Sequence, residues 1–119
     1  MLDIPAAERT LARADPVMRR LIAELGPCTW RRARGIVPYQ VLVRAVAHQQ
    51  LHGVAAEKIL GRPDVLPADD FGLRSGFRAA YRRRELPTPR ELRTFSERWR
   101  PNRSVASWYL WQAANRARK

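Results

Sequence analysis

Apolar residues recur every three or four positions along most of the chain, which is the spacing of one face of an α-helix. No stretch alternates apolar and polar residues as a half-buried β-strand would. Helices are predicted over residues 16–25, 38–50, 53–60, 70–81, 89–99 and 102–115. The pattern therefore predicts an all-α protein, a single-domain bundle of about six helices.

The predicted bundle occupies residues 15–115. Residues 1–14 are interpreted as an N-terminal lead-in that Leu11 anchors, and residues 116–119 as a basic tail that frays. The one compositional break is a short Gly/Pro connector at residues 61–67, between two helical halves.

Two of these helices carry clear start signals. Asp15 followed by Pro16 is typical of an N-cap and a first helical position, and Gly26-Pro27 is typical of a helix end. Thr88-Pro89-Arg90-Glu91 has the spacing of a capping box, in which the threonine and glutamate side chains bond each other's backbone amides.

The chain carries a formal net charge of +12, and arginine far outnumbers lysine. Such a charge favours a polyanionic partner, and nucleic acid is the first candidate, because neutralised phosphates release counterions. A basic, solvated surface without a partner is the alternative. The single cysteine, Cys28, excludes an internal disulfide and a cysteine-based zinc site.

Two adjacent carboxylates, Asp69 and Asp70, stand at the entrance of the helix predicted over residues 70–81. Aspartate is a good N-cap, so we expect Asp69 to cap the helix and Asp70 to project from its first turn. A carboxylate placed there could stabilise developing positive charge or accept a proton from an attacking water. Helix physics alone equally allows both residues to serve as capping groups.

The turn His48-Gln49-Gln50-Leu51-His52-Gly53 concentrates amides and imidazoles between two predicted helices. Such side chains can read base edges or fill a gap in a base stack, which makes Gln49, Gln50 and His52 candidate DNA contacts. The alternative is an ordinary polar turn in which His52 caps the next helix. The two histidines lack metal-ligand spacing, so no metal site is predicted.

The remaining aromatic and basic residues are divided between core and surface. Helical spacing places the tryptophans of the last two helices in the core, whereas Tyr109 is expected to point away from it. Phe71 is one of the apolar residues that mark the helix after Asp70. The candidate phosphate contacts are Arg82, Arg83, Arg84 and Arg103, for which simple solvation is the alternative.

Four segments, in this order, resemble those of bacterial DNA-3-methyladenine glycosylase II, in the helix-hairpin-helix DNA glycosylase superfamily. They are Asp15-Pro16-Val17-Met18 with Gly26-Pro27, residues 42–51, Pro67-Ala68-Asp69-Asp70, and residues 97–111. The resemblance implies base-excision repair: an alkylated base such as 3-methyladenine is flipped out of double-stranded DNA and its N-glycosidic bond is cleaved. It implies that Asp70 is the catalytic carboxylate, that Gln50 with Gln49 fills the vacated stack, and that no cofactor is needed.

One departure from the family concerns the middle of the chain. Residues 56–60 run directly into residues 61–65, where family members carry further helices and a phosphate-binding hairpin. We therefore expect a shortened helix-hairpin-helix glycosylase-like fold, with apolar faces through which two chains could self-associate. The alternative function is a non-catalytic, basic DNA-binding remnant of such a glycosylase.

The N-terminus lacks the basic start and apolar run of a signal peptide, and no apolar stretch reaches membrane-spanning length. A bacterial, cytoplasmic protein that associates with the nucleoid when bound to DNA is the corresponding expectation.

Overall fold

The computed structural model describes residues 3–28 and 64–117. In this part of the chain the order of elements is α1 (Ile4–Ala14), α2 (Pro16–Leu25), α6 (Phe71–Ala80), α7 (Pro89–Phe95), the 3-10 helix η1 (Ser96–Trp99) and α8 (Arg103–Ala117). No strand occurs among these residues, and the predicted all-α class is confirmed. The predicted helices at 38–50 and 53–60, Gln49, Gln50, His52 and the junction between residues 60 and 61 lie outside the described residues.

The helix boundaries follow local signals where those signals were clear. The side chain of Asp15 accepts a hydrogen bond from Val17 N at the start of α2, and Gly26 ends that helix with a φ of 83°. The capping box at the start of α7 is confirmed, because Thr88 Oγ1 accepts from Glu91 N at 3.1 Å and Glu91 Oε1 accepts from Thr88 N at 2.9 Å.

The N-terminal residues contribute more than a lead-in. α1 is a full helix of 11 residues that Asp3 caps, and its Ile4, Ala7 and Leu11 are buried in the same core as the rest of the described chain. Its contacts with α2 and α8 make it part of the bundle. At the other end, α8 continues to Ala117.

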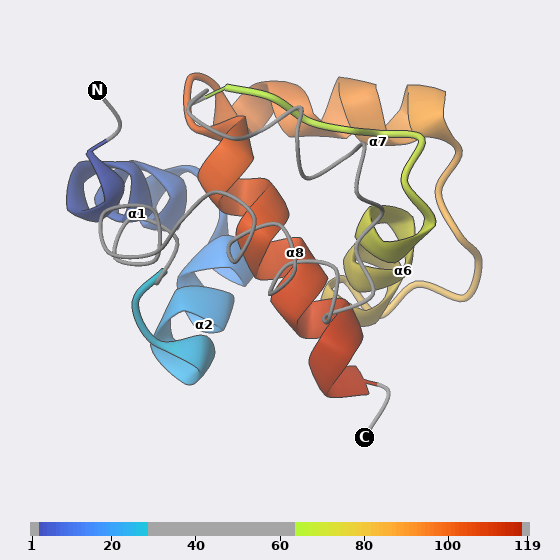
Figure 1. Ribbon diagram of the computed structural model, residues 1–119, viewed down its shortest axis with the longest axis horizontal. Helices are drawn as coiled ribbons and strands as arrows, with labels where there is room; N and C mark the ends of the chain where they lie inside the picture. Colours follow the sequence, from blue (N-terminus) through green and yellow to red (C-terminus); the bar gives the residue numbers. More distant parts are fainter. Residues whose placement is uncertain (1–2, 29–63, 118–119) are drawn as a thin grey trace, which may run out of the picture.

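Helix α8 is the centre of the structure. In Figure 1 it runs diagonally through the molecule, with α1 and α2 on one side and α6 on the other. It packs very closely on α6, since a Cβ added to Gly76 would lie 1.8 Å from the backbone oxygen of Leu110. Glycine is therefore required at this crossing, because any side chain would overlap the facing backbone.

The burial of α8 corrects one expectation about its aromatic residues. Tyr109, expected to face away from the core, is fully buried, and Trp108 is half-buried. Trp99 and Trp111 are core residues as predicted. A helix that is covered on several sides has no single apolar stripe, so its spacing cannot identify its exposed face.

The residues that border residues 29–63, Cys28 and Asp64, are both held in place by hydrogen-bond networks that include a side chain of α8. Cys28 N donates to Glu8 Oε2 at 2.7 Å, and the Tyr109 hydroxyl contacts the same oxygen at 2.6 Å. On the other side, Arg103 Nε donates to Asp64 Oδ1 at 2.8 Å. None of the helices in residues 3–28 and 64–117 is long and apolar enough to cross a bilayer.

Candidate active site

The candidate catalytic carboxylate, Asp70, is itself the N-cap of α6. Its Oδ2 accepts from Leu73 N at 2.9 Å and from the indole Nε1 of Trp111 at 2.9 Å. Asp69, which we expected to be the cap, is exposed and makes no such bond. That prediction is wrong because Trp111, 41 residues further along, selects the second aspartate rather than the first.

The preceding backbone turn helps to set the position of Asp70. Ala68 N donates to the oxygen of Leu66, and Asp70 N donates to the oxygen of Pro67 at 3.0 Å. Pro67 and Ala68 are buried, so the turn rests against the core. The carboxylate is therefore fixed from three directions: by its own turn, by the first turn of α6 and by α8.

Within the part of the chain that the structure describes, only one oxygen of Asp70 is hydrogen-bonded. Both hydrogen bonds described above go to Oδ2, and no hydrogen bond from a described residue reaches Oδ1. The residue is half-buried, which leaves part of the carboxylate accessible. An oriented carboxylate at the edge of the protein can stabilise a positive charge that develops beside it, because it needs little reorganisation.

An exposed aromatic residue follows this carboxylate in the sequence. Phe71 directly follows Asp70 and is the only large hydrophobic side chain among residues 3–28 and 64–117 that is strongly exposed. A ring that is 63% exposed gains little from the protein's own core. It is well suited to contact a flat, apolar group brought next to Asp70.

Asp15 has the same local arrangement as Asp70, a helix cap bonded to an indole, but a different role. It also caps a helix and accepts an indole N–H, from Trp99 Nε1 at 2.8 Å. It further accepts the Tyr81 hydroxyl at 2.5 Å and is only 2% exposed. Burial and the bond to Asp15 raise the pKa of the Tyr81 hydroxyl, so this group keeps its proton and donates it.

The difference between the two aspartates decides which one is a candidate for catalysis. Asp15 is buried and its contacts hold the protein together, so it has a structural role, whereas Asp70 is half-buried and described residues bond only its Oδ2. The indole partners of both aspartates were missed in the sequence. They lie 84 and 41 residues away, and no local pattern signals them.

The predicted arginine contacts fall into two groups. Arg82, Arg83 and Arg84 are exposed and form no ion pair with a described residue, and Arg82 has a φ of 54° in the turn after α6. Arg103 is different, because its side chain is only 15% exposed and pairs with Asp64 at 2.8 Å. Its first role is therefore to hold residue 64 against α8, and its predicted DNA contact stays a prediction.

Burial alone would raise the pKa of Asp64. The hydrogen bonds and charge of Arg103, with the charge of Arg100, outweigh it and hold the pKa of this carboxyl below its usual range. Asp64 is thus committed to an ion pair. Within residues 3–28 and 64–117, no group of three or more His, Cys, Asp or Glu side chains could hold a metal ion.

Comparison with known proteins confirms the resemblance predicted from the sequence. The chain is 41% identical over 58 residues to a Schizosaccharomyces pombe protein named "DNA-3-methyladenine glycosylase 1", a match that covers 49% of this chain and 25% of that protein. It is 39% identical over 114 residues to a Mycobacterium tuberculosis protein named "Probable bifunctional transcriptional activator/DNA repair enzyme AlkA", covering 92% of this chain and 21% of that protein.

The chain thus spans between a fifth and a quarter of the length of these two relatives, at 21% and 25%. No family model matches the chain. No solved structure matches it significantly either.

Proposed function

Because the chain is a relative of the DNA-3-methyladenine glycosylases, we propose that it acts on double-stranded DNA and hydrolyses the N-glycosidic bond of alkylated bases, with Asp70 as the catalytic carboxylate. One observation carries the proposal: Asp70 is held through Oδ2 by Leu73 and Trp111, while no described residue donates a hydrogen bond to Oδ1.

The chemistry needs few groups. Alkylation of a ring nitrogen gives the base a positive charge, so it can leave as a neutral molecule. The bond between C1′ of the sugar and the base nitrogen breaks, and its electron pair goes to the base. The sugar becomes positively charged near C1′, where the negative charge of Asp70 stabilises it. Water then bonds to C1′ and gives up a proton, with the carboxylate as the nearest acceptor.

The base has to leave the duplex before this reaction can occur, since the bond is inaccessible inside the stack. The exposed ring of Phe71 provides a surface for the extruded base next to Asp70. Gln49, Gln50 and His52 remain the predicted residues for filling the vacated stack. The net charge of +12, with the exposed arginines at residues 82–84, supports binding to the phosphate backbone.

The test is release of methylated bases from alkylated duplex DNA by the purified chain. We expect release by the wild type, a loss of about 100-fold or more in Asp70→Asn, and little change in Asp69→Asn. The Asn side chain can still cap α6, so the loss would report on charge rather than on folding. If Asp70→Asn released bases as fast as the wild type, Asp70 would not be the catalytic residue.

Absence of release by folded wild-type protein would favour the alternative, a non-catalytic DNA-binding remnant. The observation behind this alternative is that residues 56–60 run directly into residues 61–65, where family members carry the phosphate-binding hairpin. Such a protein should bind duplex DNA in a salt-sensitive manner, without preference for an abasic-site analogue and without dependence on Asp70. Light scattering of the same preparation tests the predicted self-association.

A further inference from the structure

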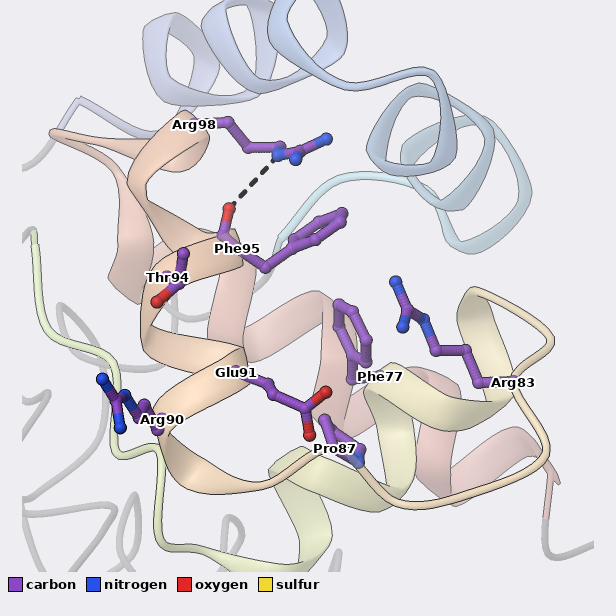
Figure 2. Close-up of a pocket in the computed structure, with 8 residues that line it drawn as sticks. All are labelled: Phe77, Arg83, Pro87, Arg90, Glu91, Thr94, Phe95 and Arg98. Atoms are coloured by element: carbon purple, nitrogen blue, oxygen red, sulfur yellow. Dashed lines mark hydrogen bonds between the residues drawn. The ribbon is translucent and has the colours of Figure 1, made fainter.

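The exposed arginines that follow α6 also belong to a basic surface between the end of α6 and α7. A hollow of about 420 Å³ lies there, lined by Phe77, Arg83, Pro87, Arg90, Glu91, Thr94, Phe95 and Arg98 (Figure 2). A neighbouring hollow of about 550 Å³ shares Arg83, Pro87 and Glu91 with the first and adds Arg84. Together the two hollows form one elongated groove, which we call the α6–α7 groove.

The arginines of the α6–α7 groove form no close ion pair with a described residue, although the charge of Arg83 lowers the pKa of Glu91 in the same groove. Arg83, Arg90 and Arg98 are exposed, and none of them forms an ion pair with a described residue. By contrast, Arg20, Arg100, Arg103 and Arg116 are all paired with carboxylates. Guanidinium groups that gather without partners favour an anionic ligand, because their charges repel one another until an anion is bound.

The groove also holds a flat surface in a fixed orientation. The guanidinium carbon of Arg98 lies 3.6 Å from the centre of the Phe95 ring, and Arg98 Nε donates to the oxygen of Phe95 at 3.2 Å. One face of the guanidinium is thus supported by the ring, and the outer face is free for another planar group. Nucleic-acid bases stack on arginine planes in this manner.

Arg83 approaches from the opposite side of the hollow, with its guanidinium carbon 5.2 Å from the centre of the Phe77 ring (Figure 2). Glu91 lies between the arginines, and its hydrogen bonds with Thr88, together with the positive charge of Arg83, lower the pKa of its carboxyl. Counting four arginines against Glu85 and Glu91 leaves a net charge of +2 along the groove.

We propose that the α6–α7 groove binds an unpaired stretch of a single-stranded nucleic acid. Arg83 and Arg90 contact phosphates, and a base stacks on the outer face of Arg98. A single strand fits better than a duplex because the bases of a duplex are already stacked on one another. Two adjoining hollows provide room for more than one nucleotide, so a strand also fits better than a free mononucleotide.

This inference takes nucleic acid as the partner, as the proposed function does, but it needs no base release. Binding is measured by fluorescence anisotropy of the full 119-residue chain with a labelled thymidine decamer. A second decamer has the same number of phosphates but abasic sugars, and it reports on phosphate contacts alone. We expect the thymidine decamer to bind at least about fivefold more tightly, because each stacked base adds affinity.

Three variants separate the parts of the groove. Arg98→Lys keeps the charge but loses the plane, so it should bring the affinities for the two decamers close together. Arg83→Gln should weaken binding of both decamers and reduce the salt dependence of log K by about 0.7. Arg93→Gln removes the same charge from an exposed position of α7 outside the groove, and we expect less than a twofold effect.

Circular dichroism of each variant confirms that it is folded. The inference is overturned if the thymidine decamer does not bind, if Arg98→Lys leaves the ratio between the decamers unchanged, or if Arg93→Gln weakens binding as much as Arg83→Gln. It is also overturned if thymidine monophosphate or polyglutamate competes as well as the decamer. Because no step depends on Asp70, failure of base release leaves this test intact.

Discussion

The crossing of α6 and α8 gives a direct test of the architecture that positions Asp70. In Gly76→Ala, the added Cβ would lie 1.8 Å from the backbone oxygen of Leu110. Unbonded carbon and oxygen atoms stay ~3.3 Å apart, so the two helices must separate by roughly 1.5 Å. Neither atom belongs to a flexible side chain, and local relaxation therefore cannot relieve the overlap.

The same separation reaches the candidate site, because Leu110 is followed by Trp111. Adding roughly 1.5 Å to the 2.9 Å between Trp111 Nε1 and Asp70 Oδ2 gives about 4.4 Å, which is too long for a hydrogen bond. Overpacking costs about 1–3 kcal/mol, and loss of a bond to a charged group about 1.5–3 kcal/mol. The better helix propensity of alanine returns about 1 kcal/mol. The net expected loss is about 1.5–5 kcal/mol.

Urea denaturation of the wild type and Gly76→Ala measures this loss. Ser75→Ala is the matched control, because it adds no atoms at the neighbouring, half-buried position of α6 and should change stability by about 0.5 kcal/mol or less. The indole N–H resonance of Trp111 should shift in Gly76→Ala and stay unchanged in the control. A Gly76→Ala protein as stable as the wild type, or more stable, would refute the close crossing.

Three further predictions concern the aspartates. In urea denaturation, Asp70→Ala should destabilise the fold by about 2–3 kcal/mol and Asp70→Asn by about 1 kcal/mol or less, because only Asn can still cap α6. Equal losses in the two variants would refute the capping role. Asp15→Ala should lower the free energy of unfolding by about 3 kcal/mol or more, because the Tyr81 hydroxyl and the Trp99 indole lose their acceptor. The control Asp69→Ala, at an exposed position, should lower it by about 0.5 kcal/mol. A small loss in both variants would contradict the hydrogen-bond network of Asp15. The pKa of Asp64 is held by Arg103 below its ordinary value of 3.8, so the ionised form stabilises the fold above that pH and the effect is lost as the pH falls through the lowered pKa. Asp64→Asn should therefore be less stable than wild type at pH 7 and equally stable near pH 2, and a pH-independent difference would exclude this ion pair as the cause.

Local sequence rules predicted those parts of the fold whose cause is local. The start of α2 at Asp15 and Pro16 and the capping box of α7 depend on residues within one helical turn, and both are confirmed. The two adjacent acids before α6 were harder, since either one satisfies the capping rule. Only the indole of Trp111, brought close by the fold, distinguishes them.

The outward and inward positions of the aromatic residues show the same limit. Tyr109 was assigned to the wrong side because helical spacing reports a face only when the opposite face meets water. α8 is surrounded by α1, α2 and α6, so nearly all its positions resemble core positions. The exposure of the Phe71 ring, which directly follows Asp70 in the sequence, could not be predicted, because an apolar residue in a helix is ordinarily expected to be buried.

The candidate site also explains why α8 cannot be treated as a passive core helix. Trp111 holds Asp70, the Tyr109 hydroxyl contacts the oxygen of Gly26 at 2.8 Å, and Arg103 holds Asp64. One helix of 15 residues therefore fixes the carboxylate relative to the chain positions that border residues 29–63, where the predicted stack-filling glutamines lie. Changes within α8 should affect stability and site geometry together. A substitution reports on chemistry alone only if it keeps the hydrogen bonds that hold the side chain in place. Asp70→Asn meets that condition because it removes the charge and keeps the cap.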